Sequence, residues 1–198
     1  EETKNDITTN EIDRNVKELQ RAIVTAELSY EIWWVYKGKD SRARFIEVLN
    51  GYPLYFQMSI HSHFVAMIIS LYRLYETRKD TINLPQLIRL LKKQGKLTAE
   101  EIKNVESSIN RAKPLWQKVS LLRNNIFAHQ SNKFDSHDIW RKVSVTPNEF
   151  KKLIDDTKSV LNIITHLWNR SGHAFNLSAT HDVVRLLEDL KRLNEQRP

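Results

Sequence analysis

The fold class is decided by residues 11–37, which read EIDRNVKELQRAIVTAELSYEIWWVYK. Apolar side chains recur along this stretch at alternating steps of four and three residues, at Ile12, Val16, Leu19, Ile23, Ala26, Tyr30 and Trp33. A period close to 3.6 residues places them on one face of an α-helix, whereas a half-buried strand would alternate at every second residue. The stretch therefore predicts a long amphipathic helix that buries one side in a core.

The same period continues along the rest of the chain. It predicts helices over about Ser41–Asn50, from Pro53 to a polar break at residues 77–83, over Leu84–Gln94, from Thr98 to about His129, from Thr146 to about Asn169 and over about Thr180–Glu195. Thr98 with Glu101, and Thr146 with Glu149, have the spacing of a capping box at a helix start. Pro114 predicts a kink in the helix that begins at Thr98, because its ring clashes with the preceding turn.

Glycines mark the ends of these predicted helices, and no part of the sequence has the pattern of a strand. Each of the four glycines directly follows a stretch with helical periodicity. Glycine is favoured at the C-cap of a helix, so we expect the helices to end at Gly38, Gly51, Gly95 and Gly172. No segment alternates long enough for a strand, and no repeat or low-complexity linker divides the sequence. We predict a single all-α domain over residues 1–198. It is an up-and-down helical bundle with a core at about 11–170 and an accessory C-terminal helix at about 180–195.

Composition excludes several classes of protein. Cysteine is absent, which excludes a disulfide scaffold, an iron–sulfur cluster, thiolate metal ligands and a cysteine nucleophile. The longest apolar run, Phe64–Ile69, is far shorter than the roughly 20 residues of a membrane span, and no signal-peptide pattern opens the chain. We therefore expect a cytoplasmic protein with no membrane partner. The net charge of +7 is concentrated in residues 41–97, which permits a phosphate-rich partner, although a solvated basic surface gives the same surplus.

One short segment points to chemistry, residues 121–130, which read LLRNNIFAHQ. On a helical wheel an apolar seam runs along this part of the helix, formed by Leu115, Val119, Leu122 and Ile126. Arg123 and His129 fall on opposite edges of the seam. Because an unpaired guanidinium is costly to bury, we expect the seam to face a second copy of the chain rather than the protein's own core.

Such a homodimer would bring two arginines and two histidines together around one cleft. Histidine titrates near neutral pH, so two His129 side chains can take the proton of a ribose 2′-hydroxyl and protonate the leaving 5′-oxygen. Arg123 offers a planar fork to phosphate oxygens, and Asn124 can orient Arg123 or the phosphate. We therefore predict Arg123, Asn124 and His129 as catalytic residues, with no metal and no cofactor. A purely structural explanation also fits, in which Arg123 stabilises the helix end and His129 is a surface residue.

Other candidate residues carry weaker signals. His61 and His63 point about 200° apart on a helix, so they are better explained as ordinary polar or core positions than as metal ligands. Trp33, Trp34 and Tyr36 are more typical of a core and groove lining than of a base-stacking platform. The polar segment at residues 130–145 predicts a loop with possible RNA contacts, although solvent exposure explains them as well; these contacts are Gln130, Lys133, Arg141 and Lys142.

The chain resembles the HEPN superfamily and, within it, the AbiU-type abortive-infection group. These all-α domains carry an arginine, a polar residue and a histidine five or six positions later, near the end of a long helix. Arg123, Asn124 and His129 match that pattern. The likeness covers roughly residues 26–168 and includes the segments LYRLYE at 71–76, LPQLIRLLKK at 84–93 and TAEEI at 98–102.

The resemblance implies a metal-independent endoribonuclease that dimerises around a shared cleft and leaves a 2′,3′-cyclic phosphate. It also implies a role in phage defence or as a toxin. Many such proteins are paired with a nucleotidyltransferase antitoxin that modifies a tyrosine two positions after the histidine, a place that Ser131 takes in this chain.

Three hypotheses follow, and each has its own signature. A dimeric ribonuclease needs Arg123 and His129 for cleavage. A non-catalytic RNA- or nucleotide-binding module would bind RNA with a steep salt dependence and form no product. A structural helical dimer would have no affinity for RNA and would pair Arg123 with a carboxylate.

Overall fold

The computed structural model describes residues 2–124 and 143–196, with side chains from residue 9 onward. These residues form seven helices and no strand, so the predicted all-α fold is confirmed. The helices are α1 (Glu2–Lys37), α2 (Lys39–Gly51), α3 (Pro53–Tyr75), α4 (Leu84–Gln94), α5 (Ala99–Leu122), α7 (Pro147–Asn169) and α8 (Thr180–Glu195).

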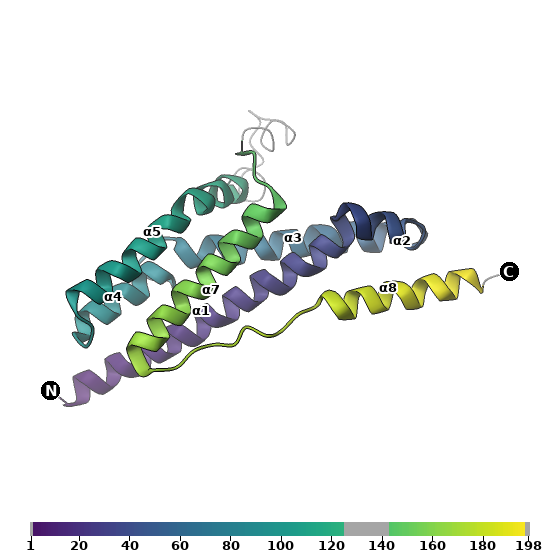
Figure 1. The fold of residues 1–198 in the computed structure, drawn as a ribbon. Helices are drawn as coiled ribbons and strands as arrows, with labels where there is room; N and C mark the ends of the chain where they lie inside the picture. Colours follow the sequence, from purple (N-terminus) through teal and green to yellow (C-terminus); the bar gives the residue numbers. More distant parts are fainter. Residues whose placement is uncertain (1, 125–142, 197–198) are drawn as a thin grey trace.

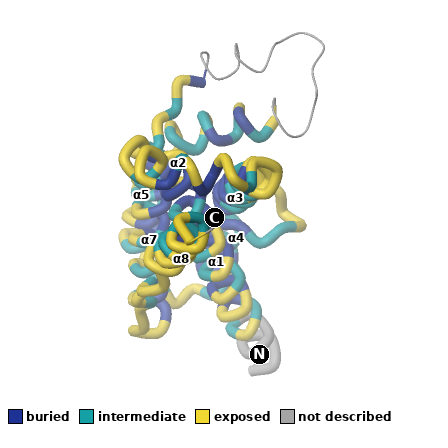
Figure 2. Tube along the Cα trace, turned by 90° about the vertical axis from the view of Figure 1, so that its right-hand side faces the viewer, coloured by how far each residue is buried: buried dark blue, intermediate teal, exposed yellow. Residues whose placement is uncertain are grey.

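Four long helices form the body of a bundle (Figure 1). Helix α1 packs against α3 and α7, α5 packs against α7 and α3, and the shorter α4 packs against α1, α3 and α5. Their apolar faces meet in one core, and all seven positions that define the period of residues 11–37 are buried in it. Figure 2 shows the same division along the other helices, with buried positions inside and exposed positions on the outer surface.

The helix boundaries agree with the sequence where capping residues define them. Both predicted capping boxes are present, at Thr98 and at Thr146. Helix α1 begins earlier than predicted, at Glu2. Helix α5 runs through Pro114 to Leu122, and the backbone of Arg123 keeps a helical conformation (φ −56°, ψ −47°). The predicted helix end near His129 and the loop up to residue 142 lie outside the described residues.

The prediction that glycines cap the helices holds for Gly95 alone, which follows α4 with φ 76°. Gly38 precedes α2 with a negative φ, and a Cβ atom there would lie 2.8 Å from the carbonyl oxygen of Trp34. The crowded junction between the last turn of α1 and the start of α2, rather than a left-handed turn, therefore explains this glycine. Gly51 lies inside α2, and α7 is capped by Arg170 with φ 60°. These cap predictions were wrong because a pattern of apolar residues does not specify backbone dihedral angles.

Helix α8 lies outside the main core and packs on α2 and α1. It shares a smaller apolar cluster with them, which includes Phe45, Val48, Val183 and Leu187. The Glu31 carboxylate of α1 holds the start of α8, because it accepts hydrogen bonds from the Ser178 hydroxyl (2.9 Å) and the Ala179 N–H (2.6 Å). Helix α8 is thus an accessory element, as predicted.

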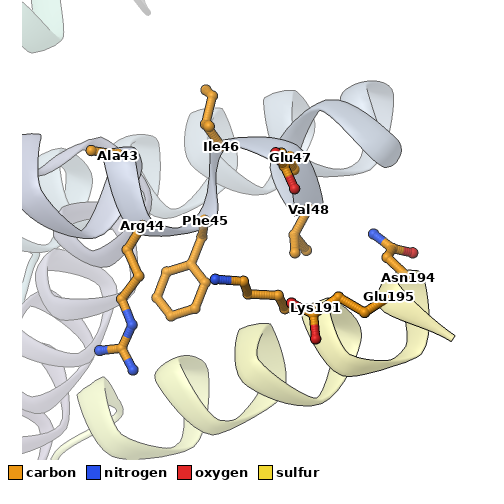
Figure 3. Close-up of a pocket in the computed structure, with 9 residues that line it drawn as sticks. All are labelled: Ala43, Arg44, Phe45, Ile46, Glu47, Val48, Lys191, Asn194 and Glu195. Carbon is orange, nitrogen blue, oxygen red and sulfur yellow. The ribbon is translucent and has the colours of Figure 1, made fainter.

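A cavity of about 340 Å³ lies between α2 and α8 (Figure 3). Phe45 points from α2 toward α8, and Lys191 of α8 reaches back toward its ring. Glu47 and Glu195 line the same cavity, and Arg44 at its edge pairs with Glu188. The cavity therefore contains charges of both signs.

Helix α3 is, among the described residues, long and apolar enough to cross a membrane by length and composition alone. The core helix of a globular bundle meets the same criteria, and one side of α3 supplies Phe64, Met67, Ile68 and Leu71 to the core. The other side carries a row that we call the α3 stripe, formed by the exposed Leu54, Tyr55, Met58, Ser62 and Ile69 and the half-buried Val65 and Ala66. No lysine, arginine, aspartate or glutamate occurs between Pro53 and Tyr72.

Candidate functional site

The seam of α5 faces the protein's own core. Val119 and Leu122 are 1% and 0% exposed, and Leu115 packs against the same cluster. Helices α3 and α7 cover this side of α5. The prediction that these three residues face a second copy is therefore wrong, and Ile126, the fourth residue of the seam, lies outside the described residues.

Arg123 stands beside this buried face and packs on an aromatic ring. Its guanidinium carbon lies 4.7 Å from the centre of the Tyr72 ring, which is a cation–π contact. Trp116, two turns earlier on α5, stacks on the same ring with centroids 6.1 Å apart and donates its indole N–H to the Tyr72 carbonyl (3.1 Å). Tyr72 therefore links α3 to the end of α5 and supports the guanidinium from below.

Asn124 contacts the same guanidinium. Arg123 Nη1 donates a hydrogen bond to Asn124 Oδ1 at 3.0 Å. No carboxylate of the described residues forms an ion pair with Arg123. Two of the four arginines on α1 and α2 differ in this respect, because Arg21 and Arg44 each bind a glutamate. An arginine that is held by a ring and an amide keeps its charge available for an anion.

The remaining predicted site residues lie outside the described residues. They are His129, Gln130, Lys133, Arg141 and Lys142. Their roles stay predictions, as does the meeting of Arg123 with His129.

An ion pair and two further hydrogen bonds, which we call the charged clamp, join the end of α5 to the start of α7. Lys118 donates hydrogen bonds to the Glu149 carboxylate (2.5 Å) and to the Ser144 carbonyl (3.0 Å). The same carboxylate accepts the backbone N–H of Thr146 in the capping box (2.7 Å). The Lys118 hydrogen bond, followed by that from Thr146, lowers the pKa of Glu149. The clamp fixes the points where the chain leaves α5 and enters α7.

The weaker candidates lie where ordinary packing would place them. His63 is half-buried, and this burial lowers its pKa, whereas His61 is exposed. No group of three potential metal ligands occurs among the described residues. Trp33 and Tyr36 are buried, and Trp34 is partly exposed.

Comparison with known families identifies the chain. The sequence model of the AbiU2 family, a HEPN group, matches residues 9–192. The protein belongs to the AbiU2 abortive-infection group of the HEPN superfamily. The match is longer than the 26–168 expected from the motif segments, and it includes most of α8. No curated protein and no solved structure gives a match.

In this HEPN protein Tyr72 contacts Arg123, although its position in the sequence does not predict this contact. The segment LYRLYE was noted only as part of the family likeness, and Tyr72 is separated from Arg123 by more than 50 residues. A spacing of two turns between Trp116 and Arg123 was a usable signal, because side chains seven residues apart share a helix face.

Proposed function

We propose that this HEPN protein is a metal-independent endoribonuclease of the phage-defence or toxin type. The observation that carries the proposal is the state of Arg123, which rests on Tyr72 and Asn124 and forms no ion pair with a described carboxylate. A structural helical dimer predicted such an ion pair. In the sequence His129 follows six positions later, as the family motif requires.

The proposed reaction is an internal phosphoryl transfer. One His129 removes the proton of the ribose 2′-hydroxyl, and the 2′-oxygen attacks the adjacent phosphorus. The bond from phosphorus to the 5′-oxygen breaks, and a second His129 gives its proton to that oxygen, which leaves a 2′,3′-cyclic phosphate and a 5′-hydroxyl. Arg123 stabilises the charge that develops on the phosphoryl oxygens, and Asn124 orients Arg123. Both proton transfers use histidine, so the reaction needs no metal.

The mechanism uses two His129 side chains and therefore needs two copies of the chain. We assign the α3 stripe as the surface through which the two copies contact each other. Each copy carries a charge of +7, so most pairs of basic surfaces repel each other. The α3 stripe has no charged side chain, and its Leu54, Tyr55 and Met58 are 77%, 61% and 62% exposed. Exposed apolar patches of this kind are typical of protein–protein contacts.

The α3 stripe also leads to the candidate site. Its last residue, Ile69, precedes Tyr72 by one helical turn, and Tyr72 carries Arg123. A two-fold contact in which the two α3 helices run parallel would place both Arg123 side chains at the same end of the interface. This replaces the α5 seam, whose described residues are buried.

The catalytic proposal is tested with purified Arg123→Ala and His129→Ala proteins and mixed RNAs. Each substitution should lower the cleavage rate at least about a hundredfold, because it removes charge stabilisation or proton transfer. Arg111→Ala, on the exposed side of α5, and His181→Ala, on α8, are matched controls that should cleave normally. Wild-type cleavage should persist in EDTA and yield 2′,3′-cyclic phosphate ends. RNA binding without any product would instead identify a binding module.

The dimer is tested with Met58→Asp, which places a carboxylate beside Leu54 and Tyr55, where the α3 stripe is most exposed. Sedimentation should show a monomer that has lost RNA cleavage but keeps its helix content. Leu186→Asp is the control, since Leu186 is an exposed leucine of α8 outside the stripe. A Met58→Asp protein that remains dimeric would exclude this interface.

A further inference from the structure

A second cavity opens at the same end of the bundle as Arg123. Its volume is about 440 Å³, within the range of small-molecule sites. It lies among α1, α3 and the start of α7, and its lining includes Trp33, Lys37, His61, Phe64, Val145 and Phe150. The ribonuclease mechanism above uses none of these residues.

The floor of the cavity is aromatic. Trp33 and Phe64 have ring centroids 5.5 Å apart, and Phe150 meets both rings edge-on at 6.2 Å and 5.9 Å. These three side chains are at most 9% exposed and belong to the main core. The floor is therefore rigid and apolar, and it suits a flat hydrophobic group.

The rim of the cavity is polar and carries one lysine. Lys37 at the end of α1 and Gln57 and His61 on α3 are exposed, and no acidic side chain lines the cavity. The cavity between α2 and α8 differs, because Glu47 and Glu195 line it. An apolar floor beneath a lysine, a histidine and an amide matches a planar aromatic ring joined to an anion, which is the chemistry of a nucleotide.

The position of the cavity relates it to Arg123. Phe64 on its floor and Tyr72 beneath Arg123 are eight residues apart on α3, or about 12 Å along the helix axis. Val145 on the opposite wall follows Ser144, whose carbonyl is bound by Lys118 of α5. A few nucleotides of single-stranded RNA can span the roughly 12 Å along α3 between the cavity and the residue beneath Arg123.

We infer that the cavity binds one unpaired nucleobase, with its phosphate at Lys37 and His61, and that it selects which nucleotide lies close to the cleaved bond. The effect on the cleavage position rests on the proposed ribonuclease function. Nucleotide binding in the cavity does not depend on cleavage. Sequence-specific recognition of RNA generally uses such unstacked bases.

The chain contains its own matched controls for this cavity. Lys39 is an exposed lysine two residues after Lys37 and does not line the cavity. His63 is two residues after His61, on a different side of α3, and does not line it either. We would titrate the full chain and its Lys37→Ala, His61→Ala, Lys39→Ala and His63→Ala variants with nucleoside 5′-monophosphates. The indole N–H signal of Trp33 in NMR spectra reports binding.

Lys37→Ala and His61→Ala should each weaken nucleotide binding about tenfold, which is the usual effect of losing one charged hydrogen bond. Lys39→Ala and His63→Ala should change it less than about twofold. Gln57→Trp, which fills the mouth of the cavity, should abolish the Trp33 shift. Equal losses in the Lys37 and Lys39 variants, or no response of Trp33 to any monophosphate, would overturn the inference.

A cleavage experiment separates this inference from the proposed function. Lys37→Ala should change the nucleotide preference beside the cut in a randomised single-stranded RNA, while Lys39→Ala keeps the wild-type preference. His129→Ala should bind monophosphates like the wild type. Nucleotide binding without cleavage by the wild type would contradict the ribonuclease and leave the cavity supported. Cleavage whose preference is unchanged by Lys37→Ala would contradict the cavity and leave the ribonuclease supported.

Discussion

The two ends of the bundle use polar side chains in different ways. At the end formed by the start of α5 and the close of α7, Trp168 donates its indole N–H to Asp13 (2.9 Å). Lys96 donates to the carbonyl of Trp168 (2.5 Å) and also lies over its ring. The Trp168–Asp13 hydrogen bond joins α7 to α1, and Lys96 joins the α4–α5 connection to α7, so these groups contribute to stability.

At the opposite end, Arg123 contacts a ring and a neighbouring amide, and Lys37 stands at the rim of a cavity that no acidic side chain lines. A helix bundle gains little stability from cations placed in this way. The comparison distinguishes two kinds of cationic side chain. One kind holds helices together, as Lys96 does, and the other is positioned to bind an anion. The predictions below test this separation by the free energy of unfolding, from the largest effect to the smallest.

Trp168→Ala should be the most destabilising change, at about 3–5 kcal/mol in urea unfolding. It leaves a cavity in the main core and removes the hydrogen-bond partner of Asp13. The remaining folded fraction should cleave RNA at the wild-type rate per molecule. A loss of specific activity in that fraction would contradict the assignment of Trp168 to stability alone.

Lys158→Met should cost about 2–3 kcal/mol, since it leaves the carboxylate of Glu27 buried without its main partner. Glu27 is 6% exposed and pairs with Lys158 across α1 and α7, while Lys151 stays 3.8 Å away. The double variant Glu27→Gln with Lys158→Met should recover part of the loss. Thermal unfolding of the wild type, Glu27→Gln, Lys158→Met and the double variant would show a coupling of the two sites, and strictly additive losses would contradict it.

The sequence predicted the core better than the contacts between helices. The period of residues 11–37 identified the buried face of α1, because one helix face always meets one environment. The same wheel put Leu115, Val119 and Leu122 on one face of α5 but did not say what covers it, and α3 and α7 cover it. The contact of Arg123 with Tyr72, and the cavity near Phe64, depend on how α1, α3, α5 and α7 cross. No spacing within one segment contains that information.

Acid should distinguish the two capping boxes. The pKa of Glu149 is lowered chiefly by the Lys118 hydrogen bond, whereas that of Glu101 is lowered by hydrogen bonds from Thr98. A carboxyl with a lowered pKa in the folded state contributes stability above its unfolded pKa of about 4.3, and the contribution is lost as pH falls through the folded pKa. Glu149→Gln should therefore remove up to about 1 kcal/mol of stability at pH 7 and less at pH 3.

The measurement is urea unfolding of Glu149→Gln and Glu101→Gln at pH 7 and at pH 3. The difference between wild type and Glu149→Gln should shrink on acidification. The Lys118→Met variant should bring the pH dependence of Glu149 closer to that of Glu101, since each carboxylate then keeps only its capping threonine. A Glu149→Gln effect that is the same at both pH values would exclude the clamp as a source of stability.

Arg123→Ala should have the smallest effect on folding, within about 0.5 kcal/mol of the wild type, because an exposed cation–π contact contributes only about that much. The same substitution should abolish RNA cleavage. Tyr72→Leu sharpens the point: it keeps an apolar side chain against Trp116 but removes the ring beneath the guanidinium. Cleavage by this variant should fall because Arg123 loses its orientation, while RNA binding changes little, since the charge is still present. If Arg123→Ala instead unfolds the protein as readily as Trp168→Ala, the arginine supports the bundle, and the two ends do not differ in kind.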